Sequence, residues 1–186
     1  MASIFDKAKD AVIGVVKGAG DIVNSVRSTV TDIVVSTLKE AGEITGTALG
    51  VVSDAVRGAF RGAKDAGAEA TESARAIVSG AVEGVAQVGG DVVTGAKNAV
   101  RGAIQGAAEV GGDVAGAAVA AVEGAVASAG KLGKDVGEVA KGTAEQALET
   151  AGSVASESVG AVKKGLRSAA SLPREVIESV VGKDDS

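Results

Sequence analysis

The sequence predicts an all-α, non-globular fold: one long hendecad-repeat amphipathic helix that joins others in a right-handed coiled coil or helical tube. Three observations lead to this prediction. An eleven-residue repeat runs through most of the 186 residues, four positions of the repeat never carry a charge, and the positions that flank them carry charges of opposite sign. Because eleven residues fill three turns at about 3.67 residues per turn, the apolar face should wind to the right.

The first nine residues are predicted to begin this helix. Ser3 and Asp6 have the spacing of a capping box, in which each side chain accepts a hydrogen bond from the backbone N–H of the other residue. We therefore expect residues 1–9 to form the start of the helix, ahead of the repeats.

The repeats occupy residues 10–172. DAVIGVV at 10–16, DAVRGAF at 54–60 and NAVRGAI at 98–104 lie 44 residues apart, which is four times eleven. Cut every eleven residues from Asp10, the chain gives fifteen blocks without an insertion or deletion. Positions two, three, six and ten of these blocks hold no charged residue, although 23% of the chain is charged. These columns have the spacing of the core positions of an eleven-residue coiled coil.

The larger side chains in these columns are expected to form a seam that faces partner chains or lipid. At position three, Gly replaces Val in every second block between residues 56 and 133, which predicts layers of large and small side chains packed between close helices. A second interpretation stays open, in which Gly89-Gly90 and Gly111-Gly112 are turns between shorter antiparallel helices. The seam residues are Ile22, Ile33, Ile44, Val56, Ile77, Val78, Val88, Val92, Val100, Ala103, Val114, Val122, Leu132 and Val136.

The positions on either side of the seam carry opposite charges. Every charge at position five is acidic and every charge at position eleven is basic. Because flanking charges set partner and orientation in coiled coils, this pattern predicts parallel neighbours with an acidic edge beside a basic one. The alternative is a solvated face without a partner. The edge residues are Glu69, Asp91, Asp113, Asp135 and Glu157 on the acidic side and Lys64, Arg75, Lys97, Lys141 and Lys163 on the basic side.

Residues 173–186 follow the repeats. Pro173 should stop or kink the long helix, because proline lacks a backbone N–H and its ring clashes with the preceding turn. We expect a short C-terminal helix after it and a frayed tail.

The composition argues against catalysis and against nucleic-acid binding. The chain has no Cys and no His, so no catalytic residue, metal ligand or cofactor is predicted. A net charge of −5 and 1% aromatic residues provide neither a basic surface nor a stacking platform for nucleic acid. No signal peptide or transmembrane helix is recognised, since the longest uncharged runs are about half a membrane span. This predicts an intracellular protein, cytoplasmic or peripheral to a membrane.

The eleven-residue blocks, and especially VGGDVVTGAKNAVRGA at 88–103, resemble the amphipathic repeats of synucleins, perilipins and late-embryogenesis-abundant proteins, and more loosely those of phasins. The resemblance covers residues 10–172. It implies an adaptable helix that coats lipid or protects membranes during drying.

These features predict a non-enzymatic structural protein that assembles with copies of itself into a rod, tube or filament and serves as a scaffold or stalk. In a tube of several chains, the small seam residues would line an apolar lumen. The alternative is a peripheral protein whose helix coats a membrane or droplet, or a stress protectant. The expected partners are other copies of the chain or a lipid surface, and the number and direction of the chains stay open.

Overall fold

Residues 3–18 and 21–182 are described in the computed structural model, and they form ten α-helices and one short 3₁₀ helix. The predicted single long helix is therefore wrong. The α-helices are α1 (Ile4–Gly18), α2 (Ile22–Ala41), α3 (Gly46–Leu49), α4 (Val51–Asp65), α5 (Ala70–Gln87), α6 (Val92–Glu109), α7 (Val114–Lys131), α8 (Val136–Val154), α9 (Val159–Ser168) and α10 (Arg174–Val181), and the 3₁₀ helix is η1 (Ser156–Ser158). α3 is a single turn of four residues.

The helices from α4 to α7 end at glycines that turn the chain back. Around Gly111, the N–H of Gly112 donates to the carbonyl of Ala107 at 2.8 Å, and the N–H of Gly111 donates to Ala108 at 3.1 Å. This pair of bonds is the Schellman motif, in which a residue of positive φ closes the last helical turn. The interpretation of the glycine pairs as turns is thus confirmed. Four glycines spaced 22 residues apart have φ between 66° and 86°: Gly67, Gly89, Gly111 and Gly133.

Aspartates begin the three helices that follow the turns at Gly89, Gly111 and Gly133. The carboxylate of Asp91 accepts a hydrogen bond from the N–H of Thr94 at 2.7 Å, and Asp113 and Asp135 each accept from the N–H three residues on at 2.9 Å. Such an aspartate satisfies a backbone donor that the first helical turn leaves free.

The lengths of the central helices and of their connections explain why the eleven-residue spacing of the sequence also fits one continuous helix. α5, α6 and α7 have 18 residues each and are separated by four-residue connections. One helix and one connection therefore fill 22 residues, which is two eleven-residue blocks. The eleven-residue pattern therefore continues without a shift across these turns. For this reason the pattern does not reveal where the chain turns.

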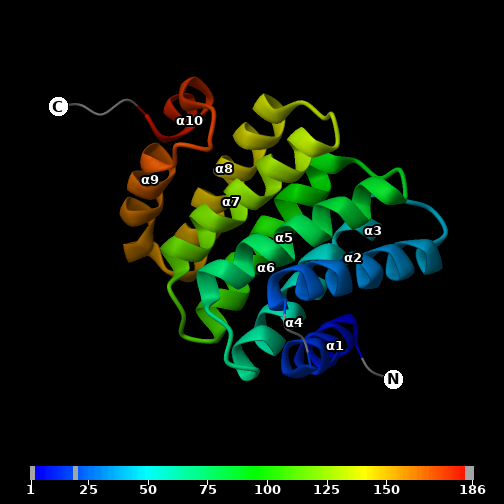
Figure 1. The fold of residues 1–186 in the computed structure, drawn as a ribbon. Helices are drawn as coiled ribbons and strands as arrows, with labels where there is room; N and C mark the ends of the chain where they lie inside the picture. The colour runs from blue at the N-terminus through cyan, green and yellow to red at the C-terminus, as the bar shows by residue number, and fades with distance from the viewer. Residues whose placement is uncertain (1–2, 19–20, 183–186) are drawn as a thin grey trace.

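The helices stack in two layers. One layer contains α1, α4, α6, α8 and α10 in that order, and the other contains α2, α5, α7 and α9. Successive long helices along the chain lie in opposite layers and contact each other across the interior. Figure 1 shows the chain advancing from the blue N-terminal end of the stack to the red C-terminal end, so that the two termini lie at opposite ends of the molecule.

The hydrophobic core lies between the two layers and runs along the whole stack. It consists mostly of Ala and Val, with Phe60, Ile104 and Leu166 among its largest fully buried side chains. Because Ala and Val are small, the helices must lie close together to reach the packing density of a protein interior. The apolar columns of the repeat are therefore the interior of one chain, where the sequence had predicted a coiled-coil seam or a lipid-facing surface.

Neighbouring helices of one layer touch at glycines. A Cβ atom on any of four glycines, spaced 22 residues apart, would lie less than 3.0 Å from a backbone carbonyl oxygen of the adjacent helix. These glycines set how closely α1 approaches α4, α2 approaches α5, α4 approaches α6, and α5 approaches α7. They are Gly58, Gly80, Gly102 and Gly124.

The capping box predicted at the start of the first helix is present. The N–H of Asp6 donates to the hydroxyl of Ser3 at 3.1 Å, and the carboxylate of Asp6 accepts from the Ser3 hydroxyl at 2.7 Å and from the Ser3 N–H at 3.4 Å. The Ser3 hydroxyl is the main reason that the pKa of Asp6 is held below its ordinary value. At the other end, Pro173 directly precedes the short helix α10. The predicted frayed tail, 183–186, falls outside the described residues.

Candidate functional site

Most of the predicted seam lies inside the chain. The side chain at the start of α2, Ile22, is 40% exposed. The other seam residues meet helices of their own chain, because the turns fold the repeat back on itself. Those partly buried against the core are Ile33, Ile44, Val88, Leu132 and Val136. Those buried in it are Val56, Ile77, Val78, Val92, Val100, Ala103, Val114 and Val122.

The predicted acidic edge consists of residues at helix starts. Asp91, Asp113 and Asp135 are the N-cap residues of α6, α7 and α8. Glu69 has the same place before α5 without a side-chain cap bond, and Glu157 lies in η1. Free N–H groups and the helix dipole favour an acid at a helix N-terminus. The acidic charges at position five are therefore explained by their place at helix N-termini of one chain.

The predicted basic edge lies on the helices themselves. Arg75 of α5 pairs with Glu123 of α7, which is not one of the predicted acidic residues. A Cβ on Gly142 of α8 would lie 3.4 Å from Cδ of Lys97, so the aliphatic stem of this lysine packs over α8. The remaining basic residues lie wholly or partly exposed on their helices: Lys64, Lys141 and Lys163.

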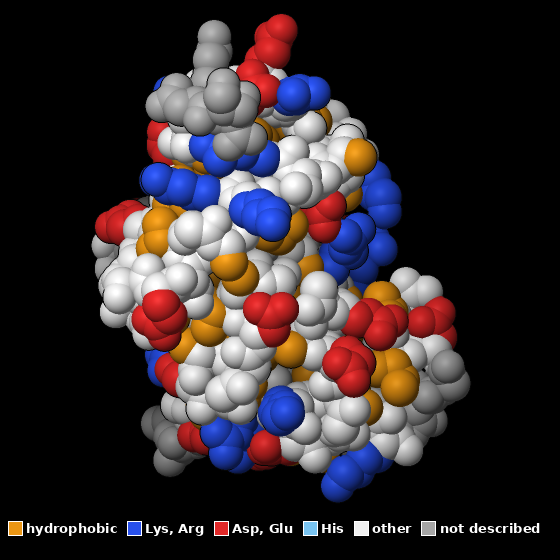
Figure 2. Space-filling model, turned by 90° about the vertical axis from the view of Figure 1, so that its left-hand side faces the viewer, with side chains coloured by type: hydrophobic (Ala, Val, Ile, Leu, Met, Phe, Trp, Pro, Cys, Tyr) orange, Lys and Arg blue, Asp and Glu red, His pale blue; other side chains and the backbone are white. Residues whose placement is uncertain are grey.

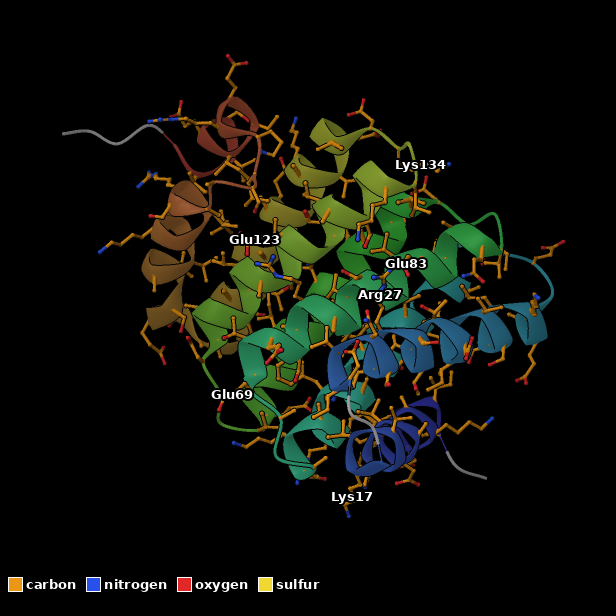
Figure 3. All side chains as sticks on the ribbon, in the orientation of Figure 1. Lys17, Arg27, Glu69, Glu83, Glu123 and Lys134 are labelled. Atoms are coloured by element: carbon orange, nitrogen blue, oxygen red, sulfur yellow. The ribbon has the colours of Figure 1, made fainter. Side chains whose placement is uncertain are left out.

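Arginine–glutamate pairs join neighbouring helices of the same layer. In Figure 3, Arg27 and Glu83 point toward each other, and Nε and Nη2 of the arginine lie 2.9 and 2.6 Å from the two carboxylate oxygens. Sequence reasoning missed these pairs, because their partners lie 48 to 56 residues apart on helices that a single long helix does not bring together. The pairs are Arg27–Glu83 between α2 and α5, Arg57–Glu109 between α4 and α6, and Arg75–Glu123 between α5 and α7.

A polar groove of about 260 Å³ lies between α6 and α8. Arg101 is one of its lining residues, and its Nε atom is buried and has no hydrogen-bond partner among the residues that the structure describes. The side-chain amide of Gln146 donates to the hydroxyl of Thr150 at 3.0 Å and to Glu149 at 3.5 Å. The groove thus brings the guanidinium of Arg101 together with hydroxyl and amide groups, and the Nε of that guanidinium is buried without a partner. Its lining residues are Arg101, Gln105, Gln146, Glu149, Thr150 and Ser153.

A second pocket, of about 450 Å³, lies between α9 and α10 at the C-terminal end of the stack, with Leu166 and Ile177 in its lining. Arg167 donates to the main-chain carbonyls of Val181 and Gly182 at 3.1 and 2.9 Å, which fastens the end of α10 to α9. Figure 2 shows this end of the molecule, where apolar side chains are scattered among charges of both signs.

Within residues 3–18 and 21–182, no group of three or more acidic side chains lies close enough to hold a metal ion. One described helix, α7, is long and apolar enough to cross a membrane, but 61% of it is buried in the molecule. α7 lies between α5 and α9 in its layer and also contacts α6 and α8, which accounts for its apolar composition as a core helix.

A solved structure supports the helical repeat architecture. The chain is similar to the crystal structure of a de novo designed helical repeat protein, DHR7, with a TM-score of 0.51 and 21% sequence identity over 96% of this chain and 95% of that chain. This likeness shows the fold: packed helices in a globular, solenoid-like repeat. No protein family matches the sequence, and no curated protein matches it.

The resemblance to synucleins, perilipins and late-embryogenesis-abundant proteins is overturned by this fold. The resemblance was inferred from a continuous eleven-residue period. In the structure this period runs through several helices and turns, and α5, α6 and α7 each fill two blocks with the connection that follows. The predicted coiled coil, filament and lipid-binding helix are wrong for the same reason, because each required the apolar columns to face outward from one long helix.

Proposed function

We propose that this chain is a non-enzymatic structural protein, a self-contained helical repeat module that serves as a scaffold and holds its two ends at a fixed separation. The observation that supports the proposal most directly is the single hydrophobic core, which extends from Ala8 in α1 to Val181 in α10. Every long helix contributes to this core and none stands apart from the stack.

The close contacts between helices favour a rigid scaffold. In a stacked repeat each helix contacts only its neighbours, so the shape of the whole follows from the spacing at each contact. Here glycines place backbone against backbone in each layer, and arginine–glutamate pairs join the same helices at the surface. Sliding one helix along the next would break both kinds of contact.

The proposed scaffold acts as a single chain. Self-association was expected because the apolar columns needed a partner to cover them. In the structure the chain covers them itself, which removes that reason for assembly.

A distance measurement tests the proposal. The chain has no Cys, so Ser36→Cys in α2 and Ser179→Cys in α10 introduce two exposed attachment points for spin labels near opposite ends of the stack. We expect a narrow distribution of distances between the labels that does not change with protein concentration. Singly labelled variants serve as controls and should give no dipolar signal. A broad distribution would contradict a rigid scaffold, and a dipolar signal from a singly labelled variant would contradict a single-chain scaffold.

A further inference from the structure

Two equivalent positions of the 44-residue repeat have different surroundings. NAVRGAI at 98–104 repeats DAVRGAF at 54–60, so Arg101 of α6 corresponds to Arg57 of α4. Arg57 has two carboxylates beside it: Glu109 of α6 accepts from its Nε at 3.0 Å, and Asp54 accepts from its Nη1 at 3.3 Å.

Both carboxylates are absent at the second position. The residue 44 positions after Glu109 is Ser153, and the residue 44 positions after Asp54 is Asn98. Their side chains are engaged on their own helices, because Ser153 donates to the carbonyl of Thr150 at 2.9 Å and Asn98 donates to that of Thr94 at 3.1 Å. Arg101 therefore keeps the charge of the repeat without the acids that accompany it.

The helix contact beside Arg101 also has different residues from the contact beside Arg57. On α6, Gly102 and Gly106 bring the helix against α4, where a Cβ on either would lie under 3.0 Å from the neighbouring helix. The residues 44 positions later on α8 are Gln146 and Thr150, which are 7% and 3% exposed and bonded to each other. Longer side chains thus lie at the contact of α8 with α6, where glycines lie at the contact of α6 with α4. Gln146 and Thr150 line the polar groove.

The groove has one charge of each sign in its lining, and the acidic one already accepts a hydrogen bond from a neighbouring side chain. Arg101 lies in the groove, and Lys97 lies one turn before it on α6. Glu149 is the acid in the lining, and it accepts a hydrogen bond from Gln146. A guanidinium binds a planar carboxylate through two parallel N–H donors, and a buried donor left without a partner is unfavourable.

We propose that the groove between α6 and α8 is a carboxylate-binding site, in which a carboxylate from outside the chain takes the place that Glu109 has beside Arg57. The bound group accepts from the guanidinium of Arg101. The side-chain amides and hydroxyls of the lining hold the rest of the ligand.

The signal of the arginine Nε–H group in nuclear magnetic resonance tests this site in the intact protein. The resonance that disappears in Arg101→Gln is assigned to Arg101. Addition of sodium acetate should shift that resonance in a saturable way, whereas sodium chloride at the same ionic strength should not. The resonance of Arg57, which already has carboxylate partners, is the internal control and should stay in place.

Exchanging the residues between the two repeats completes the test. Ser153→Glu restores the carboxylate of the repeat and should weaken acetate binding at Arg101 about tenfold or more. The double variant Asp54→Asn with Glu109→Ser copies the second position onto the first and should make the Arg57 resonance respond to acetate. An Arg101 resonance that shifts equally with chloride, or that responds to acetate unchanged in Ser153→Glu, would overturn the proposal.

Peptides distinguish the source of the carboxylate. The acetylated and amidated peptide Ala-Ala-Glu-Ala-Ala is compared with acetate and with the same peptide carrying Gln. Binding of the Glu peptide at least about tenfold tighter than acetate supports an acidic segment of another protein as the ligand, and equal affinity supports a free carboxylate. Equal binding of the Gln peptide would contradict carboxylate recognition.

Discussion

Gly102 shows how one missing side chain sets the distance between two helices. A Cβ at this position would lie 2.5 Å from the carbonyl oxygen of Ser53 and 3.0 Å from Cβ of Val56, both on α4. Because the nearest obstacle is backbone, no rotation of a side chain relieves it. Any larger residue must push α6 away from α4.

The substitution Gly102→Ala should therefore lower the free energy of unfolding by about 1–3 kcal/mol, as an overpacked core does. This loss occurs although Ala is the better helix former by about 1 kcal/mol. Gly14→Ala in α1 is the matched control, because a Cβ there meets nothing within 4 Å. It should raise the free energy of unfolding by about 0.5–1 kcal/mol. Denaturant titration measures both, and a gain in Gly102→Ala would contradict the packing argument.

At the scale of elements, four residues form each connection between the central helices. In the connection 110–113, Gly111 has φ +66° and closes α6, and Asp113 caps α7. The sequence had placed Gly111 among the small residues of a layered seam packed between close helices. In the structure a Cβ at Gly111 meets nothing within 4 Å, so the demand on this residue comes from its backbone conformation.

Gly111→Ala should lower the free energy of unfolding by about 1–2 kcal/mol, because a left-handed backbone brings Cβ close to the following carbonyl oxygen. Gly112→Ala is the control in the same turn. A Cβ on Gly112 would have ordinary contacts at 3.4–3.6 Å, and its φ lies outside the left-handed region. Thermal or denaturant unfolding should therefore show a smaller loss for Gly112→Ala, and equal losses in both variants would contradict the assignment of the strain to Gly111.

The elements at the two ends could be predicted from local sequence alone. Ser3 and Asp6 form a capping box three residues apart, and Pro173 precedes a short helix, so both features depend on neighbours in the chain. The groove at Arg101 could not be predicted in this way. Its residues come from α6 and α8, and the absence of a carboxylate there becomes visible only when the Arg57–Glu109 pair is known.

At the scale of the whole molecule, the stack buries its apolar columns without help from another molecule. Each central helix contacts neighbours in its own layer and in the opposite one, and the core continues from one end to the other. Burial of this kind supplies the stability that a chain with 28 glycines does not obtain from helix propensity.

The purified chain should consequently be helical and monomeric in the absence of lipid. Circular dichroism with and without anionic vesicles measures helix content, and light scattering measures mass. We expect a helical spectrum that vesicles leave unchanged, and the mass of one chain. A coil-like spectrum that becomes helical on addition of vesicles would contradict the fold, whereas a helical oligomer would contradict the single-chain scaffold.

The order of the amino acids establishes the eleven-residue repeat with its multiples of 22 and 44 residues, the uncharged columns and the small side chains that allow close packing. What those columns face depends on how the helices pack in three dimensions. Apolar burial is non-directional, so a second chain, a lipid surface or the next helix of the same chain would each satisfy the same columns. Glycines of positive φ followed by capping aspartates select the last of these. Because each of α5, α6 and α7 fills two whole blocks together with its connection, that selection leaves the eleven-residue period unchanged.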